Sequence, residues 1–163
     1  MKKFLSLLCV GALMLSVLSG CSSETAKINA FEQENEALKK ELNAINEKYR
    51  KELEIRQLLN KKSFEIIHAM KNKDIEVLEK YLSKETACAD DKISSKQYEY
   101  LFSSAISENR LQTYWNWEDE SNLFYIGYSI MKIENGIAFP IQEEEFEYRL
   151  ENGEWKLVGI AQQ

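Results

Sequence analysis

Two Asn-Gly dipeptides near the C-terminus constrain the fold more than any other feature of the sequence. Asn135-Gly136 and Asn152-Gly153 each stand between runs rich in aromatic and branched apolar residues. A type I′ turn needs positive φ at both central residues, and Asn-Gly adopts it readily. The pattern predicts four antiparallel strands, near 110–117, 122–134, 137–150 and 154–161.

The two turns also predict which side chains share a face of the sheet. Pairing about Asn152-Gly153 gives three opposed pairs: Leu150 with Trp155, Tyr148 with Leu157, and Phe146 with Gly159. The same counting about Asn135-Gly136 adds Tyr125 and Leu123 to that face. Pro140 lies within strand 137–150 and has no amide hydrogen, so we expect a bulge or a sheet edge there.

Segment 27–59 predicts a long helix because it lacks Gly and Pro and is rich in Glu, Lys, Ala and Leu. Its apolar residues recur at steps of three and four, with Asn35 in one core position: Ile28, Phe31, Leu38, Leu42, Ile45 and Tyr49. Glu52 and Arg56 take the next core positions and end the pattern. Two interpretations stay open: a homodimer through residues 28–49, in which Glu34 and Lys39 would pair between parallel helices, or a single amphipathic helix.

Three shorter helices are predicted between residue 61 and residue 106. The first carries Ile66, Ile67 and Met70, and Asn72-Lys73-Asp74 interrupts it. Asp74 is a suitable N-cap for a second helix, which turns Leu78 inward. After a polar stretch, Ser95 opens a third predicted helix that extends to Ile106.

This order of elements resembles the nuclear transport factor 2-like superfamily, in which a bent sheet forms a cone around helices. The stretch "FEIIHAMKNKDIEVLEKYLS" is similar to the family's opening helical pair, and "YRLENGEWKLVGI" is similar to its closing hairpin. The resemblance covers residues 61–163. It implies an α+β fold, with a long N-terminal helix followed by helices and a curved antiparallel sheet. The superfamily includes isomerases, dehydratases, transport adaptors and lipoproteins, so the fold does not decide the function.

The N-terminus has the three-part layout of an export signal. Two lysines precede an apolar run that is too short to span a bilayer comfortably and that ends in small residues. Leu18-Ser19-Gly20-Cys21 resembles the lipobox of bacterial lipoproteins, in which the cysteine is diacylated and becomes the first mature residue. The predicted organisation is a signal peptide at 1–20, a lipidated leader at 21–26, a helical stalk or short coiled coil at 27–60, and a cone-like domain at 61–163.

Lipid on Cys21 would hold the mature chain at the cell membrane, facing outside the cytoplasm. The formal charge is −6 for the whole sequence, and removing Lys2 and Lys3 takes it to −8. This balance argues against nucleic acid as a partner. Attachment would then depend on the acyl chains. Cys88 is the one thiol left over, and we expect it to be passive.

The predicted site lies inside the cone. Glu143, Glu144 and Glu145 are consecutive on one strand, so alternation sends at least one of them to the opposite face. If Glu144 points inward beside Tyr125 and Phe146, it is a candidate base; the alternative is an open rim that leaves all three in water. Five aromatic residues are predicted to line the pocket with it: Tyr114, Trp115, Trp117, Tyr125 and Tyr128.

No catalytic residue, metal or cofactor is assigned from the sequence. His68 is the only histidine, and it lies beside Ile67 on a helix, where packing explains it. The preferred interpretation is non-catalytic binding of an envelope protein or a small apolar ligand. The alternatives are an isomerase or dehydratase with a glutamate base in an aromatic pocket, and an oligomerising spacer.

Overall fold

The computed structural model describes the backbone of residues 2–106 and 109–162 and the side chains of residues 27–105 and 109–162. Internal contacts divide the chain into two units, Met1–Arg50 and Lys51–Gln163. The predicted signal peptide at 1–20 and the side chain of Cys21 lie outside the described side chains. Among the described residues, none forms a helix apolar and long enough to cross a membrane.

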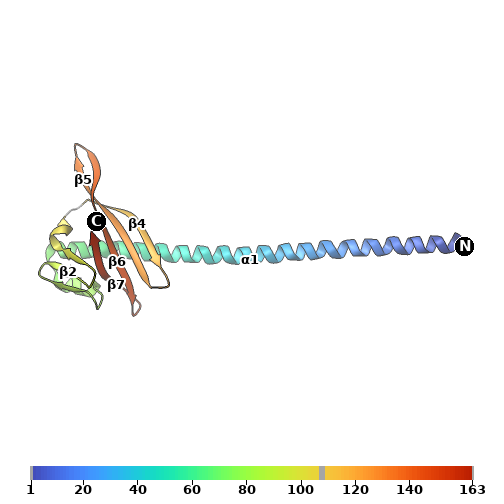
Figure 1. Ribbon diagram of the computed structural model, residues 1–163, viewed down its shortest axis with the longest axis horizontal. Coiled ribbons are helices and arrows are strands. Elements are labelled where there is room, and N and C mark those ends of the chain that lie inside the picture. The colour runs from blue at the N-terminus through green and yellow to red at the C-terminus, as the bar shows by residue number, and fades with distance from the viewer. Residues whose placement is uncertain (1, 107–108, 163) are drawn as a thin grey trace. The chain divides into compact units, whose positions relative to one another are not determined.

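The elements confirm the predicted α+β fold class, with a long helix followed by a short helix and antiparallel strands (Figure 1). In chain order they are α1 Lys2–Asn72, α2 Ile75–Tyr81, β1 Ala87–Ala89, β2 Lys92–Ser94, β3 Glu99–Leu101, the 3₁₀ helix η1 Phe102–Ile106, β4 Arg110–Glu118, β5 Leu123–Glu134, β6 Ile137–Glu151 and β7 Glu154–Gln162. The second unit begins upstream of residue 61, because the last turns of α1, with Ile55 and Leu59, belong to its core.

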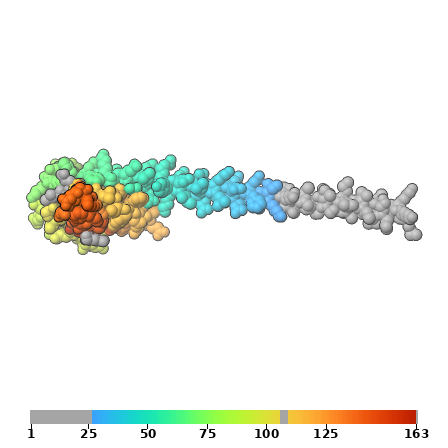
Figure 2. Space-filling model, turned by 90° about the horizontal axis from the view of Figure 1, so that it is seen from above, coloured from blue at the N-terminus to red at the C-terminus, as the bar shows by residue number. Residues whose placement is uncertain are grey.

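Within the first unit, α1 carries an exposed apolar stripe. Figure 2 shows this part of α1, from residue 27, in blue to cyan. The six residues of the stripe, which we call the seam residues, are each 55–65% exposed: Ile28, Phe31, Leu38, Leu42, Ile45 and Tyr49. No other segment of the described chain buries them.

In the second unit, β4, β5, β6 and β7 form one antiparallel sheet in chain order. Both predicted hairpin turns are confirmed, since Asn135 and Gly136 have φ of 53° and 77° and Asn152 and Gly153 have φ of 52° and 84°. The four strands match the predicted ranges within two residues. Asn-Gly turn chemistry therefore fixes this half of the fold.

Two bulges change the register that simple counting from the turns predicts. The pairing of β5 with β6 shifts between Met131–Pro140 and Ile130–Gln142, which confirms the bulge expected at Pro140. Beyond it Phe146 pairs with Ile126 rather than with Tyr125. A shift of one residue exchanges the two faces of a strand. The prediction that Tyr125 and Leu123 share a face with Phe146 is therefore wrong.

The second bulge lies between β6 and β7. Leu150–Trp155 and Tyr148–Leu157 pair as predicted. The register then shifts at Val158, so that Gly159 pairs with Glu147 and not with Phe146. The sequence around Val158 contains no proline and gives no sign of this bulge.

The third predicted helix, from Ser95 to Ile106, is wrong over its first part, where β3 joins a three-stranded sheet, β1-β2-β3. Only its end is helical, as η1. Ser95 does not cap a helix; it closes a turn, in which its N–H donates to the carbonyl of Tyr98 at 2.8 Å. The chain then enters β3, where Tyr100 pairs with Ile93 and is fully buried. Asp90 and Asp91, both with positive φ, form the turn between β1 and β2.

The core of the second unit lies between α1, α2 and one face of the four-stranded sheet, which we call the inner face. Asp74 begins α2 as predicted, because its carboxylate accepts the N–H of Val77 at 3.1 Å. The helices bury Leu59, Ile66, Met70 and Leu78, and the sheet buries Phe124, Ile126, Tyr128, Phe146, Tyr148 and Leu157, all at 0–1% exposure. Side chains thus fill the space that an open cone would leave.

Candidate functional site

The six residues predicted to line one pocket divide between the two faces of the sheet. Four of them belong to the inner face: Trp115, Trp117, Tyr128 and Glu144. Tyr114 and Tyr125 belong to the opposite, outer face, because Tyr114 pairs with Gly127 and Tyr125 with Glu147. The structure therefore does not bring these six side chains together around a single cavity.

The two tryptophans of β4 lie against charged residues of α1. The indole N–H of Trp115 donates to Glu52 at 2.8 Å, and the guanidinium of Arg56 lies 3.7 Å from the centroid of the Trp115 ring. Lys51 lies 5.0 Å from the centroid of the Trp117 ring. Cations that cover aromatic faces in this way stabilise the contact between helix and strand. They also occupy the flat surfaces that were predicted to hold a ligand.

Glu144 points inward and is 1% exposed, while Glu143 and Glu145 are only partly buried. The structure thus has Glu144 inward, and the three glutamates do not share an open rim in water. The Glu144 carboxylate accepts bonds from Arg110 Nε at 2.9 Å and from the Tyr100 hydroxyl at 2.5 Å. Both side chains of the Arg110–Glu144 ion pair are essentially inaccessible to water. The carboxylate is therefore neutralised on one side and hydrogen-bonded on the other.

Arg110 connects this ion pair to the backbone that precedes it. Its guanidinium also donates to the carbonyls of Ala105 and Ser104, at 3.3 and 3.2 Å. Burial lowers the pKa of Arg110, but its hydrogen bond to Glu144 and the charge of that carboxylate outweigh burial, so the net shift is upward. Arg110 is therefore held charged, as a fixed partner of Glu144.

Three tyrosines of the second unit, which we call the core tyrosines, are fully buried: Tyr100, Tyr128 and Tyr148. Burial raises the pKa of Tyr128 to about 12, and burial also raises the pKa of Tyr148 well above its ordinary value. Burial and the neighbouring Glu144 charge raise the pKa of Tyr100. All three hydroxyls stay protonated near neutral pH. Tyr100 donates to Glu144 and Tyr128 donates to Asn60, while Tyr148 shares a hydrogen bond with Ser63.

The outer face carries hydroxyl–glutamate pairs along β6. Tyr114 lies against Gly127 and donates to Glu145. Tyr98 lies against Gly159 and donates to Glu147 at 2.6 Å. A hollow of about 280 Å³ beside the first pair is lined by Thr113, Tyr114, Glu143, Glu144 and Glu145. The acidic groups here accept bonds from hydroxyl groups of the same chain, which belong to Tyr114, Tyr98 and, for Glu143, Ser129.

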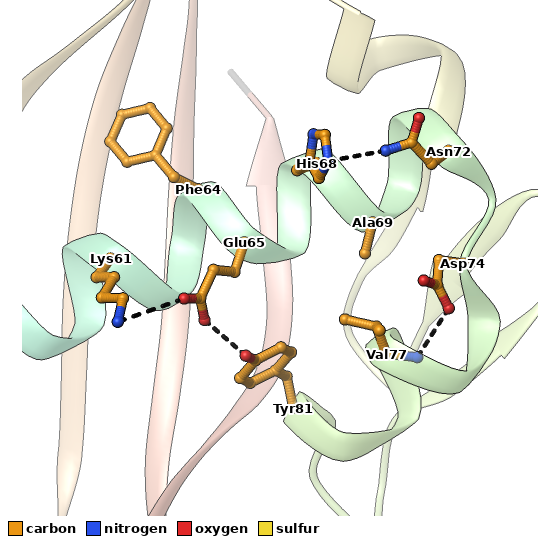
Figure 3. A pocket seen from close by; sticks show the side chains of 9 residues that line it. All are labelled: Lys61, Phe64, Glu65, His68, Ala69, Asn72, Asp74, Val77 and Tyr81. Atoms are coloured by element: carbon orange, nitrogen blue, oxygen red, sulfur yellow. Dashed lines mark hydrogen bonds and ion pairs between the residues drawn. The ribbon is translucent and has the colours of Figure 1, made fainter.

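A larger groove, of about 610 Å³, lies between α1 and α2 (Figure 3). We call it the helical groove; nine residues line it: Lys61, Phe64, Glu65, His68, Ala69, Asn72, Asp74, Val77 and Tyr81. Figure 3 shows Ala69 of α1 and Val77 of α2 turned toward one another. The Phe64 ring is 44% exposed and meets Tyr128 edge to face, at 5.9 Å between centroids.

The polar residues of the helical groove are ordered by one another. Glu65 accepts the Tyr81 hydroxyl at 2.6 Å and pairs with Lys61 at 3.7 Å. The ring of His68 is hydrogen-bonded to Asn72 at 3.0 Å. An apolar floor with a few fixed polar groups is the composition that binding sites share. Two helices joined by a short turn build this arrangement.

Sequence reasoning did not predict the helical groove. Phe64, His68 and Asn72 recur at steps of four and so share one face of a helix, which was the available signal. An aromatic residue at such a position is usually part of the core, whereas the Phe64 ring is 44% exposed. Among the described residues, no group of three or more His, Cys, Asp or Glu side chains is placed to hold a metal ion.

The chain was compared with known families, curated proteins and solved structures. No family model and no curated protein matches it. A designed nuclear transport factor 2-like protein is similar to it, with 14% sequence identity, coverage of 64% of this chain and 98% of that chain, and a TM-score of 0.39. A likeness at that score does not establish a common fold, so the α+β assignment comes from the helices and strands themselves.

Proposed function

We propose that this protein is an envelope lipoprotein, anchored through Cys21, whose α+β unit of nuclear transport factor 2-like type binds a protein partner in the helical groove. The observation that carries the proposal is the exposed Phe64 ring in the lining of the helical groove, which also includes the apolar side chains of Ala69 and Val77. Exposed aromatic anchors next to apolar pockets dominate the energy of many protein interfaces.

Binding is favoured over catalysis by the state of Glu144. A general base must accept a proton from a substrate within hydrogen-bond reach. The Glu144 carboxylate instead accepts bonds from Arg110 and Tyr100, and it is buried away from the helical groove lining. An enzyme that used it would first have to break a buried ion pair.

The openness of the helical groove favours a protein segment over a small ligand. Sites for small molecules cover most of the ligand's surface. In this groove Phe64, His68 and Asn72 are themselves exposed, so a small apolar molecule would keep much of its surface in water. A helix or extended segment can bury its own apolar side chains there and leave its other side in solvent.

The lipid anchor is supported by the lipobox and is tested by a single substitution. We expect mass spectrometry of the native protein to find diacylglyceryl on Cys21 and no residues before it. Cys21→Ser should move the protein from the membrane fraction to the soluble fraction, whereas Cys88→Ser should leave it in the membrane. An unmodified thiol at position 21 would contradict the anchoring part of the proposal and leave the groove untouched.

The helical groove is tested by photocrosslinking in intact cells. A photoreactive amino acid at His68 should give one discrete protein adduct, and the same group at Leu111, which is 58% exposed but outside the groove, should not. Phe64→Ala should abolish the adduct, while Ile137→Ala, which truncates a residue that is 67% exposed, should preserve it. Melting temperatures of both variants check that they fold.

Two results would contradict a protein partner in the groove. The first is an adduct that survives Phe64→Ala. The second is the absence of any protein adduct, together with a small apolar molecule retained on the purified protein in native mass spectrometry, which would assign the groove to a small ligand.

A further inference from the structure

The seam residues form an apolar surface that one copy of this chain does not cover. All described side chains from Lys27 to Arg50 are exposed. Single exposed apolar residues are normal on a protein, but here six align on one face of α1. Their spacing of alternating three and four residues is the pattern of a two-stranded coiled coil.

Charges beside the seam match a second copy of the chain in parallel orientation. In the heptad set by the seam residues, Lys27 and Glu34 occupy g positions, and Glu32 and Lys39 occupy the e positions of the following heptads. In a parallel dimer each g residue faces the next e residue of the other helix. Lys27 then faces Glu32 and Glu34 faces Lys39, which gives opposite charges in every charged pair.

Asn35 distinguishes the two orientations. In a parallel dimer Asn35 faces Asn35 of the second copy, and the two amides can bond to each other, which is how a core Asn fixes register. An antiparallel pairing of the same seam sets Asn35 opposite Leu38 and brings Glu34 near Glu41. That arrangement leaves a buried amide without a partner and places like charges together.

We infer that residues 28–49 form a parallel, two-stranded coiled coil with a second copy of this chain. The inference goes beyond the proposed groove and does not depend on it or on the lipid, because the seam residues and their flanking charges all lie within the first unit.

The test measures self-association of the chain from residue 21 onward, with Cys21→Ser so that no lipid is attached. Sedimentation equilibrium should give a reversible dimer. Leu38→Lys, which puts a charge in the seam, should raise the dissociation constant about 100-fold or more. Ala37→Lys adds the same charge on the outer side of the helix and should change it by less than about threefold.

Tryptophan fluorescence separates loss of association from loss of folding. All three tryptophans, Trp115, Trp117 and Trp155, lie in the second unit, so their spectrum should be unchanged in both variants. A chain that stays monomeric at submillimolar concentration would overturn the inference. Equal effects of Leu38→Lys and Ala37→Lys would also overturn it, because the interface would then lie elsewhere.

Orientation is tested by a disulfide and by charge reversal. In a Cys88→Ser background, Leu42→Cys should form a disulfide-linked dimer, since parallel helices bring the two copies of position 42 together. Glu34→Lys should weaken the dimer, and Lys39→Glu added to it should restore the affinity. Failure of Leu42→Cys to link, or a charge-reversed double variant weaker than Glu34→Lys alone, would exclude the parallel arrangement.

Discussion

Removal of Arg110 should destabilise the protein more than removal of any exposed cation. Arg110→Met would leave the Glu144 carboxylate buried with only the Tyr100 hydroxyl as a partner. Breaking one side of a buried ion pair costs about 3–5 kcal/mol. The carbonyls of Ala105 and Ser104 would also lose a donor, which adds about 1 kcal/mol. Domains of this size are stable by about 5–15 kcal/mol, so the variant should lose a large part of its stability.

The assay is urea unfolding followed by tryptophan fluorescence, with an exposed ion pair as the control. Lys132 pairs with Glu134 at 2.5 Å, but both side chains are more than half exposed. Lys132→Met should therefore change the free energy of unfolding by about 0.5 kcal/mol or less. If Arg110→Met lowers the free energy of unfolding no more than Lys132→Met does, the buried ion pair does not stabilise the protein as its burial predicts.

A second variant keeps this prediction testable if Arg110→Met fails to fold. Arg110→Met combined with Glu144→Leu and Tyr100→Phe removes the cation, the carboxylate and the donating hydroxyl together. No charge is then left unpaired in the core, and buried ion pairs replaced by apolar residues are often neutral in stability. The triple variant should be at least about 2 kcal/mol more stable than Arg110→Met. A triple variant no more stable than Arg110→Met would show that the unpaired Glu144 carboxylate is not what destabilises the single variant.

Two further predictions concern the glycines under tyrosines and the response to high pH. Gly159→Ala should destabilise the protein more than Gly127→Ala. A methyl group on Gly159 would lie 2.6 and 2.7 Å from Cγ and Cβ of Tyr98, near its backbone, whereas one on Gly127 would meet only the outer ring atoms of Tyr114, which can swing into solvent. Thermal melts compare the two variants, and equal losses of melting temperature would contradict this reasoning. Burial raises the pKa of Tyr128 to about 12, so its stabilising contribution is complete below about pH 10 and is lost as pH rises through about 12. Tyr128 alone should then lower the free energy of unfolding by about 1.4 kcal/mol per pH unit between these values. Urea unfolding as a function of pH checks this, and a Tyr128→Phe variant with an unchanged slope would refute it.

The sequence predicts the antiparallel half of the fold well because its turns are made by local chemistry. Asn135-Gly136 and Asn152-Gly153 need no tertiary contact to favour positive φ. The turn at Asp90 and Asp91 has the same conformation but a weaker local signal, since aspartate enters this region at a cost that glycine avoids. The strands on either side of it are three residues long, too short to show alternation.

The predicted lining of the site is wrong for a different reason, which is the register between β5 and β6. Pro140 identifies where β6 bulges, but the sequence does not say that the extra residue changes the partner of every position beyond it. The change moves Tyr125 to the outer face and brings Ile126 beside Phe146 in the core. Glu144 was expected beside apolar and aromatic residues, whereas β4 begins with Arg110, which neutralises it. A partner so far along the chain cannot be found by local patterns.

The point where the apolar stripe stops has a physical explanation in the second unit. Glu52 and Arg56 continue the seam spacing of α1, yet both contact Trp115 of β4, one through a hydrogen bond and the other by stacking. A leucine at either position would lose that contact and would add no burial, because the indole already covers the helix there. The seam positions of α1 are therefore apolar up to Tyr49, where we infer that they face a second helix. They are charged at Glu52 and Arg56, which face the edge strand of the sheet. On this basis Arg56→Leu should weaken the second unit and leave self-association unchanged, so urea unfolding should respond to the substitution and sedimentation should not.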